Sequence, residues 1–281
     1  MQIFDVTQAQ HFCRGYTGLP GNATLGLQDF FQNALSGHAR IREGTHVFTE
    51  YRDCLLREAE RNLFLSAASY RRGLDLMSAG SASWLQVTYY YSSFYSARCL
   101  LGICGAWVRS PARTEVVGGN PGNQEIEVVR NFGKKTTYTG THERFWDSFY
   151  DAVGPLVPWV PREYRAGLAP VNANVTWMIK ARNRLNYDSL AALDLVSQFR
   201  TSFNSRSFPH SLPGELNTQF GIAQRLLLLA CWLARQCRLA TDTFHRIQAG
   251  ATRLDTMRLY VFDAKIARMG AHSRRRQVLS T

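Results

Sequence analysis

The chain has 281 residues and 45% of them are apolar, so it can bury a sizeable core, and disorder of the whole chain is excluded. Its 33 lysines and arginines outnumber 21 acidic residues, which gives a formal net charge of +12, and only four of the basic residues are lysines. Arginine pairs with phosphate and stacks on bases, so nucleic acid or another polyanion is an expected partner; a basic, solvated surface is the alternative.

The six cysteines include no CxxC pair, and four of them lie in apolar helical patterns. We therefore expect buried, reduced thiols in a cytoplasmic protein, with no structural zinc or other metal and no cofactor. The N-terminal residues lack the charged start and apolar run of a secretory signal. The most apolar stretch, 226–234, is far shorter than the about 20 residues needed to cross a bilayer, so we expect no membrane association.

Residues 1–46 form an N-terminal extension without a sustained apolar period, in which 25–35 would make one short helix. From Leu56 to Met77 apolar residues recur every three or four positions and predict a long amphipathic helix. The stretch "SAGSAS" is expected to end this helix and to supply a serine cap for a second one from Trp84 to Leu101. Two long helices with a short connection indicate an antiparallel hairpin.

Residues 106–170 interrupt the helical pattern and read as an insertion on a helical body. "VVGGNPGNQ" is typical of a turn-rich loop, "EIEVV" and "KKTTYT" of two strands around an "RNFG" turn, and "HERFWDSFYDAV" of a short helix. "HERFW" lacks the second histidine that a helical zinc motif needs, so His142 and Glu143 are not expected to bind metal. The insertion is therefore predicted to hold a small β-hairpin.

Two more helices follow the insertion, one from about Val171 through "ARNRLNYD" and a strongly apolar one from Phe220 to about Phe244. The fold class is therefore mainly α, with a helical domain over 47–250 and a basic tail over 251–281 that we expect to be solvated.

An arginine occupies the inward stripe of the third predicted helix. Val171, Val175, Met178, Arg182 and Leu185 step by four and three, which puts Arg182 where an apolar side chain is expected. An unpaired buried charge costs several kcal/mol, so the arginine must pair, reach solvent or meet an anion. A structural ion pair and an RNA-facing role both satisfy this requirement.

The same helix is predicted to end or bend near Asn186, because Asp188 and Ser189 offer an N-cap to the following "LAALDLV". In an unbroken helix Arg182 and Tyr187 lie about 140° apart, on different faces. A break in the helix, or a second chain, would bring them to one site.

Two segments resemble HEPN domains. "YYYSSFYSARCLLGICG" resembles the aromatic-rich second helix of that family, and "RNRLNY" at 182–187 resembles the Arg-x-x-x-Asn/Asp-Tyr variant of its functional motif. The resemblance covers 50–105 and 171–247. It implies an up-and-down four-helix bundle, into which 106–170 is inserted.

The resemblance also implies a homodimer that works in RNA cleavage, toxin–antitoxin pairs or antiviral defence, with RNA and a protein such as an antitoxin as partners. The site it implies consists of Arg182, Asn183 and Tyr187 as catalytic residues, with Arg98 and Arg184 as RNA contacts. Active members have a histidine where Tyr187 stands. Tyrosine, with a pKa near 10, is only about a thousandth ionised at pH 7 and is a poor base.

Two other histidines fit the spacing, and of these His245, near the end of the last predicted helix, stays a candidate for reaching the site. Arg40 with His46 and Arg238 with His245 fit the loose Arg-to-His spacing, but about two such pairs are expected by chance. The missing histidine favours a different class of function, a noncatalytic HEPN-like scaffold or partner-binding subunit.

The contacts of the arginines distinguish an RNA-binding site from a noncatalytic scaffold. If Arg98 and Arg182 face one site, they form a phosphate clamp; if one of them meets Glu58 or Asp194, they are scaffold. The tyrosines at 89–91 are expected to be core contacts rather than base-stacking platforms.

Overall fold

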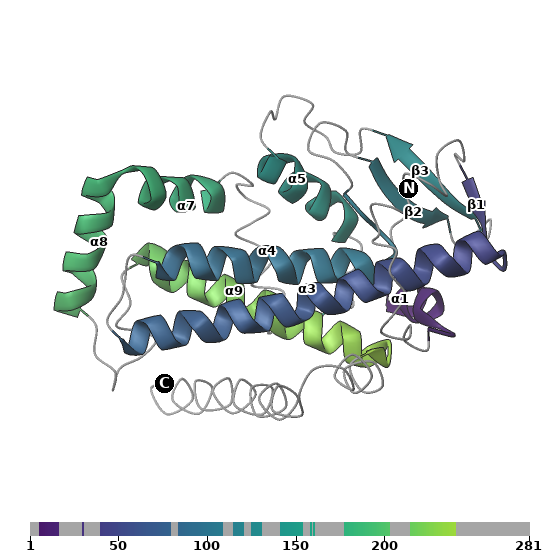
Figure 1. The fold of residues 1–281 in the computed structure, drawn as a ribbon, viewed down its shortest axis with the longest axis horizontal. Helices are drawn as coiled ribbons and strands as arrows, with labels where there is room; N and C mark the ends of the chain where they lie inside the picture. Colours follow the sequence, from purple (N-terminus) through teal and green to yellow (C-terminus); the bar gives the residue numbers. More distant parts are fainter. Residues whose placement is uncertain are drawn as a thin grey trace.

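A computed structural model gives the fold, which is mainly helical, as the sequence predicts (Figure 1). The residues that the structure describes are 6–16, 30, 40–79, 84–108, 115–120, 125–130, 141–153, 158, 160, 177–202 and 214–239.

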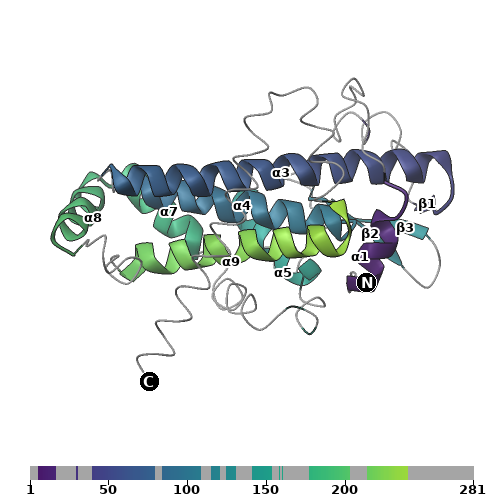
Figure 2. The same cartoon turned by 90° about the horizontal axis from the view of Figure 1, so that it is seen from below.

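Three long helices lie side by side and form the body of the molecule (Figure 1, Figure 2). They are α3 (His46–Ser78), α4 (Leu85–Ile103) and α9 (Gly214–Gln236). The Tyr89 ring near the start of α4 lies 5.8 Å from the ring of Tyr70 and 5.3 Å from that of Phe220. The start of α4 therefore meets the end of α3 and the start of α9, so α3 is antiparallel to the other two.

Small residues let α3 and α4 approach closely. A Cβ atom on Gly102 would lie 2.8 Å from the Cβ of Ala59, inside normal contact distance. The buried Ser66 hydroxyl donates to the Ser92 carbonyl at 2.8 Å, and its oxygen lies 2.6 Å from that of Ser96. These hydroxyls are satisfied between the helices, so their burial carries no unpaired donor.

The first long helix begins earlier than the apolar period indicated. It starts at His46 instead of Leu56, because the Thr45 hydroxyl oxygen accepts the Phe48 N–H at 3.2 Å and caps the first turn. The second helix starts after Trp84, which makes no side-chain cap hydrogen bond. The predicted serine cap is therefore wrong.

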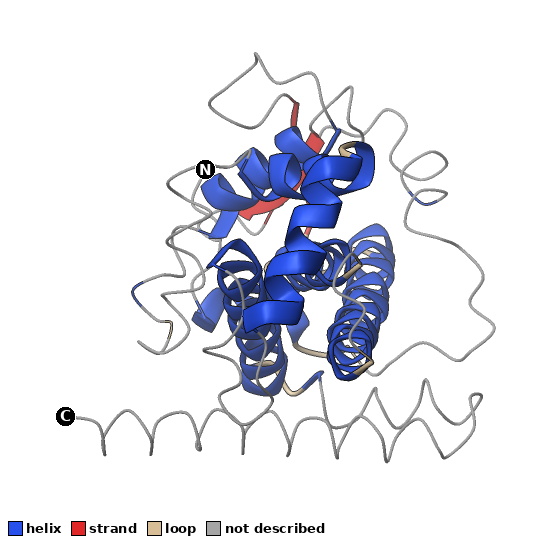
Figure 3. Ribbon diagram, turned by 90° about the vertical axis from the view of Figure 1, so that its left-hand side faces the viewer, coloured by secondary structure: helices blue, strands red, loops and turns tan. Residues whose placement is uncertain are grey.

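The third predicted helix is described as α7 (Trp177–Tyr187), and 171–176 lie outside the described residues. α8 (Ser189–Ser202) follows at once. The Asp188 carboxylate accepts the N–H groups of Leu190 and Ala191 at 3.0 and 3.1 Å, so the predicted cap is confirmed. Figure 3 shows α8 crossing the end of the long helices.

The last helix is shifted toward the N-terminus relative to its prediction. It begins at Gly214 instead of Phe220 and ends at Gln236, whereas the apolar pattern extended to Phe244. Arg238 has a φ of 58°, a left-handed conformation that cannot continue a right-handed helix. Residues 240–244 lie outside the described part of the chain.

The N-terminal extension shares the core of the helical body. α1 (Val6–Cys13) buries Ala9, Phe12 and Cys13, and the Phe12 ring lies 6.3 Å from that of Tyr51 in α3. The Gln10 amide donates to the carbonyl of Gln236 at the end of α9 at 3.2 Å. The short helix predicted over 25–35 lies outside the described residues, apart from position 30.

None of the six cysteines forms a disulfide, and Cys13, Cys99, Cys104 and Cys237 are buried. Burial raises the pKa of the Cys13 and Cys99 thiols well above the usual value, so both remain protonated at neutral pH.

A small antiparallel sheet joins the extension to the insertion (Figure 1). Its strands, in the order β1-β3-β2, are β1 (Arg40–Arg42), β3 (Glu125–Arg130) and β2 (Glu115–Asn120). β3 is the predicted "EIEVV" strand, but its partner β2 covers residues that the sequence predicts as a turn-rich loop, with Val117 opposite Val128. The predicted partner "KKTTYT" lies outside the described residues. The short helix of the insertion is α5 (Thr141–Val153).

Alanine at Gly102 is expected to lower the free energy of unfolding by about 1–3 kcal/mol, because the added methyl group meets Ala59 and forces α3 and α4 apart. Gly221→Ala in α9 is the matched control: nothing lies within 4 Å of the added atom, so the higher helix propensity of alanine should stabilise by up to about 1 kcal/mol. Chemical denaturation measures both changes. Stabilisation by both substitutions would contradict the close packing described for α3 and α4.

Candidate functional site

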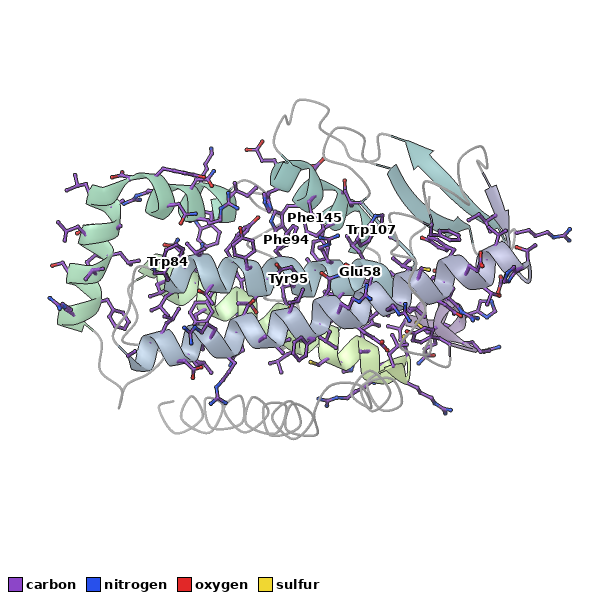
Figure 4. All side chains as sticks on the ribbon, viewed as in Figure 1. Glu58, Trp84, Phe94, Tyr95, Trp107 and Phe145 are labelled. Atoms are coloured by element: carbon purple, nitrogen blue, oxygen red, sulfur yellow. The ribbon has the colours of Figure 1, made fainter. Side chains whose placement is uncertain are left out.

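One face of α4 is covered by α5 and α7 instead of by the other long helices (Figure 1). Tyr90, Phe94 and Arg98 recur every four residues and therefore share this face. Phe94 packs against α5, with its ring 4.6 Å from that of Phe145 (Figure 4). The Tyr90 hydroxyl and the Arg98 guanidinium therefore lie on the same face of α4 as the Phe94–Phe145 ring contact.

Arg182 of α7 is directed at this face of α4, where the apolar stripe predicted it to point. Its guanidinium carbon lies 5.2 Å from the centroid of the Tyr90 ring, a cation–π contact. Its Nε and Nη2 donate to the side-chain oxygen of Asn183 at 3.1 and 2.6 Å. Arg182 and Asn183 are both partly buried, so they form one preorganised polar unit on α7.

Arg98 is held between aromatic rings. Its guanidinium carbon lies 4.5 Å from the ring centroid of Trp107 and 5.7 Å from that of Phe94. Burial lowers the pKa of Arg98, and the charge of Glu58 opposes that shift. Within the described ranges Arg98 forms no ion pair with a carboxylate.

If the arginines were part of a scaffold, Arg98 or Arg182 would form an ion pair with Glu58 or Asp194. Glu58 is engaged by Arg61 at 3.5 Å and by the Asn62 amide at 3.3 Å, so it acts on Arg98 only at longer range. Asp194 accepts a hydrogen bond from Gln198 on α8 at 2.8 Å. Neither carboxylate pairs directly with Arg98 or Arg182 in the described structure.

His142 lies beside these residues, although no sequence motif indicates it. Nδ1 of His142 on α5 lies 2.8 Å from the Tyr90 hydroxyl oxygen, which also accepts the Trp146 indole N–H at 3.4 Å. The His142 ring centroid is 5.0 Å from that of Phe94. Burial, then Arg182, then Arg98 lower the pKa of His142, so the imidazole is neutral at pH 7.

We call Tyr90, Arg98, His142, Arg182 and Asn183 the α4–α5–α7 cluster. It combines two guanidiniums held on aromatic rings with one imidazole whose Nε2 makes no hydrogen bond to the described residues. Guanidiniums bind phosphate oxygens, and an imidazole exchanges protons near neutral pH. The cluster therefore has the groups needed to bind a phosphate and to transfer a proton beside it.

Two of the predicted site residues lie away from the cluster. Tyr187 is 83% exposed at the end of α7, and Arg184 is exposed on the same helix. α7 is unbroken from Arg182 to Tyr187 and the break comes afterwards, at Asp188, so the two residues stay on different faces. Arg98 and Arg182 both lie near enough to His142 to lower its pKa, and Asn183 is bonded to Arg182, whereas Tyr187 and Arg184 are exposed on α7.

The remaining residues singled out in the sequence are His46, His245 and Tyr89. His46 forms an ion-pair contact with Glu50 at 3.2 Å at the exposed start of α3, and His245 lies outside the described residues. Tyr89 is fully buried against Tyr70 and Phe220, which confirms its predicted core role.

His142 could not be found by a local motif, because 52 residues separate it from Tyr90. The only sequence signal was the aromatic pattern of "HERFWDSFYDAV", which places His142 on the same face as the buried Phe145, Trp146 and Phe149.

Among the residues that the structure describes, no three or more His, Cys, Asp or Glu side chains gather in a way that would hold a metal ion. None of the described helices is both long and apolar enough to cross a membrane. Comparisons with protein-family models, curated proteins and solved structures gave no match. The resemblance to HEPN domains therefore stays a prediction from the two quoted segments.

Acidification is expected to destabilise the fold through His142. Its folded pKa is below the ordinary 6.5, so its contribution to stability is present above pH 6.5 and is lost as the pH falls from there through the lowered value. Urea unfolding of the wild type should show a larger loss of stability between about pH 7.5 and 5.5 than unfolding of His142→Gln.

His46→Gln, which removes an imidazole at the start of α3, controls for the loss of a histidine. Equal pH dependence in the wild type and His142→Gln would contradict the lowered pKa.

Proposed function

We propose that this protein is a HEPN-like, RNA-binding protein whose α4–α5–α7 cluster cleaves RNA without a metal ion, as a ribonuclease of the toxin or defence-effector kind. One observation carries the proposal: His142 lies beside the same tyrosine as Arg182, so an arginine and a histidine meet in space although no histidine follows Arg182 in the motif. The net charge of +12 supports a polyanionic substrate.

The helical arrangement supports the HEPN resemblance. α3 and α4 form an antiparallel pair, α7 packs on α4, and α9 lies beside both α3 and α4. The two segments that carry the resemblance contribute Tyr90 and Arg98 from α4 and Arg182 and Asn183 from α7 to one cluster. In this proposal α5 of the insertion supplies the proton-transferring residue that Tyr187 does not supply.

The chemistry assigned to the cluster is an internal transesterification. The RNA 2′-oxygen attacks the neighbouring phosphorus, the bond from phosphorus to the 5′-oxygen breaks, and the products are a 2′,3′-cyclic phosphate and a 5′-hydroxyl. The 2′-hydroxyl loses its proton to water, and the 5′-oxygen gains one from Nε2 of protonated His142, which is left neutral, so the number of protons is unchanged. Arg98 and Arg182 offset the negative charge that builds on the phosphoryl oxygens.

A second function is favoured by the outer face of α7 and α8. Leu190 and Leu193 are 72% and 65% exposed and lie three residues apart on one side of α8, and Tyr187, which ends α7 just before it, is 83% exposed. Exposed apolar side chains grouped in this way are typical of protein contacts. The alternative proposal is therefore a noncatalytic HEPN-like subunit that binds a second copy or another protein through this face.

RNA cleavage separates the two proposals. Wild-type protein incubated with end-labelled RNA in excess chelator is expected to give fragments ending in 2′,3′-cyclic phosphate. His142→Gln should lower the cleavage rate by about 10²- to 10⁴-fold, the usual contribution of one acid–base residue. Arg182→Ala should in addition weaken RNA binding and reduce its dependence on salt, since one phosphate contact is lost.

Tyr187→Phe is the matched control within the motif, because Tyr187 is exposed and lies away from the cluster; it should cleave at the wild-type rate. RNA with 2′-deoxy residues at the cleavage positions should resist. Binding without cleavage by the wild type, with oligomerisation lost in Leu190→Asp, would favour the noncatalytic subunit instead.

A further inference from the structure

The α4–α5–α7 cluster carries more positive charge than its described surroundings balance. Arg182 donates to the neutral amide of Asn183, and Arg98 lies against the rings of Phe94 and Trp107. Among the described residues, Glu58 acts on Arg98 through its charge while engaged with Arg61. Partly buried guanidiniums that both act on His142 favour an anion bound beside that ring.

His142 faces the same positive field from two elements. On α4 it contacts the Tyr90 hydroxyl, and the charges of Arg98 on α4 and Arg182 on α7 lower its pKa. Among the described groups, no carboxylate contributes to this shift. The free protein therefore keeps the imidazole neutral. An anion bound beside the guanidiniums would cancel part of their effect and favour the protonated ring.

Tyr90 is suited to hold both protonation states of His142. Its hydroxyl oxygen accepts the Trp146 N–H, so its own O–H can donate to Nδ1 of a neutral imidazole, which leaves the ring proton on Nε2. When Nδ1 gains a proton, the same oxygen can accept from it across the same 2.8 Å. Burial raises the pKa of Tyr90, so the phenol itself stays neutral throughout.

We propose that the cluster is a proton-coupled phosphate site, in which His142 takes up one proton as a phosphate group binds between Arg98 and Arg182. The bound anion is then met by two guanidiniums and one imidazolium. That the phosphate belongs to RNA rests on the proposed function. That the site binds an anion rests only on the residues of the cluster. Two sources share that chemistry, an internal phosphodiester and a terminal phosphate of an RNA strand.

Proton uptake and anion affinity are two sides of one coupling. If the anion raises the proton affinity of His142 by some factor, protonation raises the anion affinity by the same factor. Lower pH should therefore tighten binding, although it weakens the fold of the free protein. This opposite response distinguishes a coupled site from a surface whose affinity depends on fixed arginine charge alone.

Calorimetric titration tests the proposal with two probes of constant charge between about pH 6 and 8. Sulfate, a dianion, represents a terminal phosphate, and the dinucleoside monophosphate ApA represents an internal diester. Repeating each titration in buffers of different ionisation enthalpy gives the number of protons taken up. We expect uptake at pH 7.5 with at least one probe, and binding at pH 6 at least about fivefold tighter than at pH 8.

His142→Gln should abolish the uptake and the pH dependence while leaving residual binding through the arginines. Tyr90→Phe keeps the ring under Arg182 but removes the hydroxyl that holds the imidazolium, so it should reduce the uptake. Thermal unfolding of each variant checks that it is folded, and His46→Gln should behave as the wild type does.

Binding without proton uptake, unchanged pH dependence in folded His142→Gln, or no binding of either probe would each overturn the proposal. RNA binding is measured separately on the same proteins. RNA that binds without proton uptake would reject only the coupling, whereas coupled sulfate binding without RNA binding would reject the proposed function and keep the site.

Discussion

The close approach of α3 and α4 determines which face of α4 is left for the rest of the molecule. Gly102 and the hydroxyl of Ser66 allow the two backbones to pack without a large side chain between them. α9 covers a second side of α4. The remaining face carries Tyr90, Phe94 and Arg98, and it is this face that α5 and α7 reach. The candidate site therefore exists because α4 is enclosed from three directions.

The aromatic residues of α4 hold charge without neutralising it. A ring face attracts a guanidinium through its quadrupole and partly replaces the water lost on burial, yet it leaves the positive charge in place. A carboxylate at the same position would satisfy the arginine and remove its attraction for an anion. The contacts of Arg98 with Trp107 and of Arg182 with Tyr90 thus keep the site positive and fix the direction of its donors.

The insertion is part of the site rather than a decoration of the helical body. α5 packs Phe145 and Trp146 against α4, and this contact positions His142 at the Tyr90 hydroxyl. The N-terminal extension is integrated in a similar way, through α1 and through the pairing of β1 with β3. Segments that looked separable along the chain therefore share one core with the long helices.

Local sequence patterns determined the long helices, the inward position of Arg182 and the cap at Asp188, because helical periodicity and capping bonds involve residues only a few positions apart. They missed the start of α3 and the end of α9, where a cap and a left-handed residue override the apolar pattern. Only the tertiary structure decided that His142 meets Tyr90 and that Tyr187 turns outward. Both outcomes depend on how helices distant in sequence pack and on where one of them ends, and the order of residues within a motif does not specify that geometry.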